Sequence, residues 1–68
     1  MKRFATIAQA RKHHGMTQEA LAEKLGISRG AVAQWEMEGG TRPDPSNAVR
    51  LKELLPGLTL DVIYGQAA

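Results

Sequence analysis

The chain has 68 residues and no cysteine, so neither a disulfide nor a cysteine-ligated metal can help to hold its fold. A chain of this length makes one domain and buries only about 60% of the surface that it exposes when unfolded. Helices that share one apolar core are the simplest solution at this size. The net charge of +2, from nine Lys and Arg against seven Asp and Glu, permits nucleic-acid binding without arguing for it.

Membrane insertion and secretion have no support in the sequence. No apolar run approaches the ~20 residues that a membrane span needs. Lys2 and Arg3 are not followed by the apolar segment of a signal peptide. We therefore expect a soluble, cytoplasmic protein that makes no membrane contact.

The first predicted helix covers about residues 2–13. One of its faces is marked by residues at the i, i+3, i+4 and i+7 positions, namely Phe4, Ile7, Ala8 and Arg11. Gly15 is expected to end this helix, since glycine commonly follows the last helical turn.

Three further helices are predicted to begin at a hydroxyl side chain. Thr17, Ser28 and Thr59 can each accept a hydrogen bond from a free amide of the first turn. Each is flanked by two apolar residues at the spacing of a hydrophobic staple, namely Met16 and Leu21, Ile27 and Val32, and Leu58 and Ile63. The last of these helices is expected over about residues 60–64.

A loop is expected from Glu36 to Pro43, because Gly39-Gly40 interrupts any helical pattern. Asp44 and Pro45 then start another helix, since proline fits the first helical turn. The buried face of that helix is expected to comprise Ala48, Leu51, Leu54 and Leu55. Pro56-Gly57 is expected to end it.

Residues 17–36 have the pattern of a helix-turn-helix, with the turn at Gly26-Ile27-Ser28. The expected inward residues of the two helices are Leu21, Ala22, Leu25, Val32 and Trp35. In this motif the second helix enters the major groove of DNA. Its outward residues, Arg29, Gly30, Ala33 and Gln34, are therefore the candidates to face DNA.

Residues 3–64 resemble the helix-turn-helix domain of lambdoid-phage Cro and repressor proteins and of the wider xenobiotic-response-element family. The resemblance rests on the run Met16-Thr-Gln-Glu-Ala-Leu-Ala-Glu-Lys-Leu-Gly-Ile-Ser followed by Trp35-Glu36. It implies an all-α, five-helix, lambda-repressor-like domain over residues 1–65, with residues 66–68 as a tail. It also implies a transcriptional regulator, a small Cro-type repressor that binds a pseudo-palindromic operator in double-stranded DNA as a homodimer.

The resemblance assigns base reading to Arg29, Gly30 and Gln34, and the outward position of Ala33 makes it a further candidate. Arginine can pair with guanine and glutamine with adenine, each pairing worth about 1–3 kcal/mol of discrimination, and Ala33 can contact a thymine methyl. Gly30 carries no side chain, so Arg29 and Gln34 are expected to carry most of the direct readout, with DNA shape supplying the rest.

By the same resemblance, Gln18, Ser28 and Arg42 match positions that contact DNA phosphates. Arg11 and Glu36 match a partly buried salt bridge between the first helix and the end of the third. We expect that pair to serve the fold, because removing one partner of a buried ion pair costs roughly 3–5 kcal/mol.

Apolar residues near the C-terminus exceed what a short helix needs for itself. Leu58, Leu60 and Tyr64 are candidates for a two-fold dimer contact, whereas Ile63 is expected to face inward. The alternative, that these residues close the monomer core, is weighted equally.

Other chemistry is not expected. Trp35 is assigned to the core, and Arg50 and Lys52 to the surface. His13 and His14 point about 100° apart on a helix and so do not make one metal site. No catalytic constellation is present, so we expect no enzyme, no metal, no cofactor and no small-molecule ligand.

Two other readings stay open. An antitoxin-like or other protein-binding helix-turn-helix module would use the exposed C-terminal apolar residues as its partner surface, and a purely structural helical domain is the weaker alternative. The chain is expected to be either a complete Cro-like protein or the DNA-binding part of a longer repressor.

Overall fold

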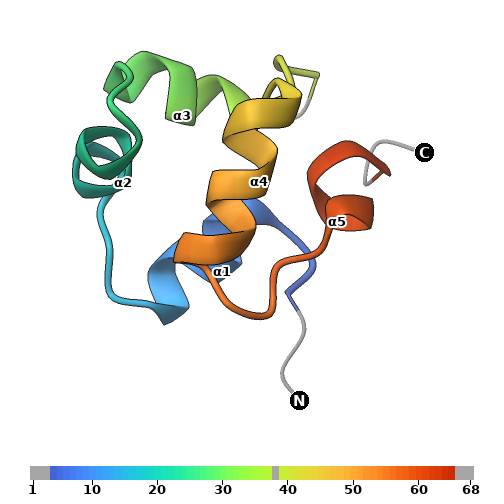
Figure 1. Ribbon diagram of the computed structural model, residues 1–68. Helices are drawn as coiled ribbons and strands as arrows, with labels where there is room; N and C mark the ends of the chain where they lie inside the picture. The colour runs from blue at the N-terminus through green and yellow to red at the C-terminus, as the bar shows by residue number, and fades with distance from the viewer. Residues whose placement is uncertain (1–3, 38, 66–68) are drawn as a thin grey trace.

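The computed structural model describes residues 4–37 and 39–65, and the polypeptide within these ranges forms helices and no strand. The helices are α1 (Ile7–His13), α2 (Gln18–Leu25), α3 (Arg29–Glu36), α4 (Pro45–Leu54) and α5 (Leu60–Gly65). In Figure 1, α2 and α3 lie at the upper left, α4 descends through the middle and α5 lies at the right. The predicted all-α architecture is confirmed, whereas the predicted tail at 66–68 lies outside the described residues.

The predicted helix starts are confirmed by their capping hydrogen bonds. The hydroxyl of Thr17 accepts from the amide of Ala20 at 3.0 Å, and that of Ser28 accepts from Ala31 at 3.2 Å. The Asp44 carboxylate accepts from Asn47 at 3.1 Å, ahead of Pro45 in the first turn of α4. The Thr59 hydroxyl accepts from Val62 at 3.3 Å. Local side-chain chemistry thus fixes where these four helices begin.

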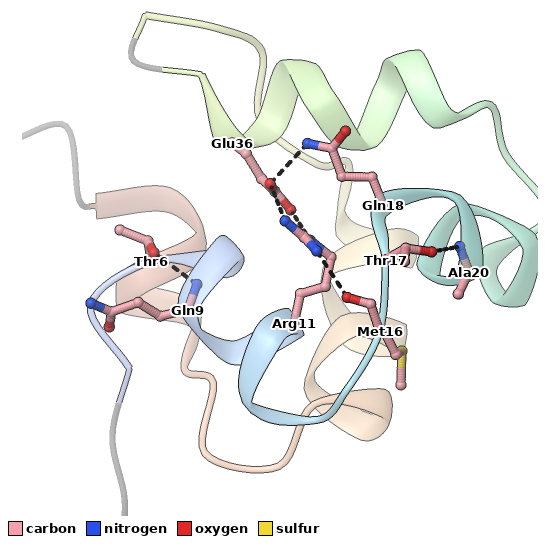
Figure 2. Close-up of polar contacts among 8 residues, drawn as sticks. All are labelled: Thr6, Gln9, Arg11, Met16, Thr17, Gln18, Ala20 and Glu36. Atoms are coloured by element: carbon pink, nitrogen blue, oxygen red, sulfur yellow. Dashed lines mark hydrogen bonds and ion pairs between the residues drawn. The ribbon is translucent and has the colours of Figure 1, made fainter.

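The prediction for the start of the first helix is wrong. Helix α1 begins at Ile7, and the Thr6 hydroxyl accepts a hydrogen bond from the Gln9 amide at 3.0 Å (Figure 2). The Gln9 side chain in turn accepts from the amide of Ala5 at 2.9 Å. Thr6 and Gln9 have the spacing of a capping box, which is the signal that would have placed this boundary. Residues 2 and 3 of the predicted helix lie outside the described part of the chain.

Helix α3 includes Glu36 as its last residue, in agreement with the helix-turn-helix stretch 17–36, so the loop expected from Glu36 begins one residue later. Glu36 lies four residues after Val32 and therefore projects from the same helical face. That one added residue turns the Glu36 carboxylate toward the interior of the domain instead of the loop.

The turn of the helix-turn-helix depends on Gly26. Its φ of 73° is left-handed, a conformation that glycine adopts without a steric penalty. The amides of Gly26 and Ile27 donate to the carbonyls of Glu23 and Ala22, at 3.2 and 3.0 Å. These are the two bonds of a Schellman motif, which ends α2 and leaves Ser28 in place to start α3.

One apolar core lies between the five helices. Its buried members are Phe4, Ile7, Ala10, Leu21, Ala22, Leu25, Val32, Trp35, Ala48, Leu51, Leu55, Leu58 and Ile63. The predicted inward residues of α2 and α3 are all among them, as is Ile63 of α5. Leu54 of the face predicted for α4 is partly buried against this core.

Leu58 is a correction to the predicted dimer contacts. It is 3% exposed and belongs to the core, so it is not available to a second copy. The reason is the staple at the start of α5, in which the residue before the Thr59 cap packs on the same side as Ile63. Leu60 and Tyr64, at 43% and 42% exposure, keep their assignment as candidates.

Arg50 is exposed, as the sequence predicted, but its guanidinium is more than a surface charge. Nη1 and Nη2 donate to the carbonyls of Leu25 and Lys24, each at 2.8 Å. Those carbonyls belong to the last turn of α2, where the helix itself supplies no donor. Arg50 therefore fastens α4 to the end of α2, immediately before the Gly26 turn.

We predict that Arg50→Ala lowers the free energy of unfolding by about 1–3 kcal/mol, because two carbonyls lose a charged donor. Urea denaturation gives the measurement. Lys52→Ala, at an exposed position of the same helix, is the matched control and should stay within about 0.5 kcal/mol of the parent protein. Equal effects of the two substitutions would contradict a capping role for Arg50.

Candidate nucleic-acid interface

Helix α3 has a buried face and an exposed face. Val32 is fully buried and Trp35 is 5% exposed, so this side of the helix packs on the core. Three of the four predicted base-reading residues, Arg29, Gly30 and Gln34, are exposed, and Ala33 is half-buried. The helix lies at the edge of the fold (Figure 1), which leaves its outer face open to a partner. This arrangement is the one that the sequence predicts for a recognition helix.

A polar network behind this face joins three helices (Figure 2). Arg11 of α1 donates to Glu36 at the end of α3 through two bonds, Nε to Oε2 at 2.6 Å and Nη2 to Oε1 at 3.0 Å. Gln18, the first residue of α2, donates from Nε2 to Oε1 of Glu36 at 3.0 Å. Arg11 also donates from Nη1 to the Met16 carbonyl at 2.8 Å. The ion pair expected between Arg11 and Glu36 is therefore present, and Gln18 reinforces it.

Both charged side chains of the pair are largely shielded from solvent, at 9% exposure for Arg11 and 8% for Glu36. Burial by itself raises the pKa of Glu36, but the hydrogen bonds from Arg11 and Gln18, with the nearby positive charges, more than offset that effect. The pKa of Glu36 consequently lies below its ordinary value of 4.5. The hydrogen bond to Glu36 likewise raises the pKa of Arg11.

An open depression of about 420 Å³ lies where α2 and α3 begin. Its lining comprises Arg11, Met16, Thr17, Gln18, Glu19 and Arg29. The depression therefore brings together a predicted phosphate residue, Gln18, and a predicted base-reading residue, Arg29. Glu19, also in this lining, adds a negative charge that would oppose an approaching phosphate.

The other two predicted phosphate residues lie elsewhere. Ser28 is exposed and its hydroxyl already caps α3. Arg42 lies in the loop between α3 and α4, where its guanidinium donates to the carbonyls of Gly40 and Thr41 at 3.3 and 3.4 Å. Arg42 is thus folded onto its own loop in this conformation, and a phosphate would have to compete with those carbonyls.

The exposed apolar surface is larger than the sequence prediction. Besides Leu60 and Tyr64 on α5, Val49 on α4 and Met37 after α3 are 55% and 53% exposed. Val49 does not fit the buried periodicity of α4, and an apolar residue at an outward helical position is the signal that would have found it.

The two histidines lie closer together than their separation of about 100° around a helix suggests. Their ring centroids are 5.1 Å apart, and the ring of Phe4 lies 5.0 Å from that of His13. The Nε2 atom of His14 is 3.0 Å from the carbonyl of Pro56. These contacts give both rings a packing role, and residues 4–37 and 39–65 contain no group of three His, Cys, Asp or Glu residues that could hold a metal.

The folded chain is thus a five-helix domain with a helix-turn-helix at α2 and α3. A helix-turn-helix family model matches residues 7–63, and the chain belongs to this family, which is of the Cro/C1 type. It is accordingly a DNA-binding helix-turn-helix regulator with a lambda-repressor-like fold. Neither the curated proteins nor the solved structures include a significant match to the chain. Within the described residues, no helix is long and apolar enough to cross a membrane.

We predict that Glu36→Gln lowers the free energy of unfolding by roughly 3–5 kcal/mol at pH 7, since the buried Arg11 loses its counter-charge. The effect should depend on pH. A carboxyl group whose pKa is depressed by folding stabilises the native state above its unfolded pKa, and this contribution disappears as the pH falls through the folded pKa. The gap between parent and variant should therefore be complete at pH 7 and shrink on acidification below about pH 4.

Urea denaturation of both proteins at pH 7 and at pH 3 measures that gap. Glu23→Gln, at an exposed position of α2, is the control and should have little effect at either pH. An unchanged denaturation midpoint for Glu36→Gln would contradict a stabilising role for the pair.

Proposed function

We propose that this regulator is a sequence-specific repressor of the Cro type, with α3 as its recognition helix. Arg29 and Gln34 read base edges in the major groove, and Ala33 lies against a thymine methyl. The main support is the division of α3 into a face committed to the core, through Val32 and Trp35, and an exposed face that carries Arg29 and Gln34.

Phosphate contacts are proposed for Gln18, Ser28 and Arg42. Gln18 begins α2, and the free amides of a helix N-terminus favour an anion. Its Nε2 atom donates one hydrogen to Glu36, which orients the amide and leaves the second Nε2 hydrogen available to a phosphate. The depression that Gln18 shares with Arg29 gives a phosphate oxygen room to approach.

Repression would be steric. Two copies of the chain occupy two half-sites about one helical turn apart and exclude RNA polymerase from the overlapping promoter. Leu60 and Tyr64 are the proposed contacts between the copies, since both are large, apolar and more than 40% exposed. Because its ligand is chromosomal or phage DNA, we place the protein in the cytoplasm.

A second candidate function is protein binding of the antitoxin type. The exposed side chains of Val49, Leu60 and Tyr64 favour it, because large apolar residues in the open often mark a partner surface. Sequence-specific DNA binding distinguishes the two functions. A repressor selects a symmetric sequence by itself, whereas a pure protein-binding module selects none.

Selection of bound sequences from a random DNA pool should return a pseudo-palindromic motif with the parent protein. Arg29→Ala and Gln34→Ala should each weaken binding by roughly 1–3 kcal/mol and relax the preference at particular base pairs, because each residue reads a base edge. Fluorescence anisotropy on the selected operator measures both quantities.

Lys52→Ala is the charge-matched control for Arg29→Ala, since it removes one positive charge from the exposed surface of α4. It should leave the preferred sequence unchanged. Binding that varies steeply with salt but recovers no motif would reduce the function to non-specific phosphate contact.

Replacing Leu60 and Tyr64 together by serine should reduce affinity for the full operator at least tenfold. Affinity for a single half-site should not change, because the recognition helix is untouched. Titrating both DNA molecules, with Met37→Ser as an exposed apolar control, measures the difference. An equal loss on the half-site would refute an interface role for these two residues.

A further inference from the structure

Gly30 differs from the other glycines whose surroundings the structure describes. Four of them have a left-handed φ that disfavours any side chain, namely Gly15, Gly26, Gly39 and Gly57. A Cβ atom on Gly40 would lie 2.0 Å from the Gln34 carbonyl oxygen, so the fold excludes a side chain there too. A Cβ atom on Gly30 would meet only the Ser28 hydroxyl, at an ordinary contact distance of 3.8 Å.

The folded chain therefore has no conformational or packing need for glycine at position 30. Gly30 lies in the first turn of α3 at an exposed position without a left-handed φ. At such a position alanine is the better residue, because glycine loses more backbone freedom on folding and is a poorer helix former. Any requirement for glycine at position 30 must therefore come from outside the isolated chain.

We propose that Gly30 is a point of close approach, where a base edge in the major groove lies against the bare Cα and leaves no room for a side chain. This inference rests on the proposed function. Gly30 would then determine specificity because it has no side chain and so admits the base edge, without making a hydrogen bond to it.

The neighbours of Gly30 support this geometry. Ala33 and Gln34 follow at i+3 and i+4 and therefore share its face, and Arg29 precedes it. The centre of that face thus consists of small residues, Gly30 and Ala33, while the long side chains of Arg29 and Gln34 stand on either side. Because only small residues lie at the middle of this face, the helix can lie deep enough in the groove for both long side chains to reach base edges.

The test compares Gly30→Ala and Gly30→Ser with the parent protein on the operator that the parent selects. Both variants should fold, and Gly30→Ala should raise the melting temperature by a few degrees, because alanine favours the helix. Both should bind the operator at least tenfold more weakly, with serine at least as poor as alanine. Ser46→Ala, a small change at the equivalent second position of α4, is the control and should not alter DNA affinity.

A map of single base-pair substitutions identifies the contact. In Gly30→Ala the loss should concentrate at one or two base pairs of each half-site, whereas uniform weakening with unchanged preferences would overturn a base-edge contact. Parent-like affinity of Gly30→Ala, or a lower melting temperature, would overturn the proposal while leaving the repressor assignment intact. Failure of the parent protein to select any DNA sequence would instead refute the proposed function, and this inference with it.

Discussion

The fold depends most on the carboxylate of Glu36 on α3, which receives hydrogen bonds from two other helices, α1 and α2. A buried carboxylate is costly unless it is paired and hydrogen-bonded. Arg11 supplies both charge and two donors from α1, and Gln18 supplies a third donor from the start of α2. Because the acceptor lies on the last residue of α3, these bonds fix the end of the recognition helix relative to both neighbouring helices.

Different contacts fix the start of α3. Arg50 of α4 binds the last carbonyls of α2, and the Gly26 turn then leads directly into the Ser28 cap. A recognition helix fixed at one end alone could still pivot about that end. Restraint at both ends sets its rotation as well, so that Val32 and Trp35 stay in the core while Arg29 and Gln34 stay outside. The exposed face of α3 is therefore held in place by one buried ion pair, Arg11–Glu36, and by the bonds of Arg50 to the end of α2.

Local chemistry explains why the sequence predicted most helix boundaries and most of the core. Caps, staples and left-handed glycines act over five residues or fewer, so they can be recognised in the sequence, and the missed start of α1 had such a signal in Thr6 and Gln9. Contacts across the fold are different. The Arg11–Glu36 pair was found through family resemblance, whereas the Arg50 bonds to α2, at a similar separation in sequence, left no pattern to recognise.

The burial of Leu58 also reduces the apolar surface through which two copies could associate. With Leu58 and Ile63 committed to the core, the exposed apolar surface of α5 is reduced to Leu60 and Tyr64, which lie one turn apart on one face. Two side chains per copy cover far less than the ~800 Å² per partner of a stable interface. The proposed association through this small surface would gain strength if DNA held the copies side by side, because their effective concentration would then be high. The operator would therefore act as the scaffold on which the dimer forms.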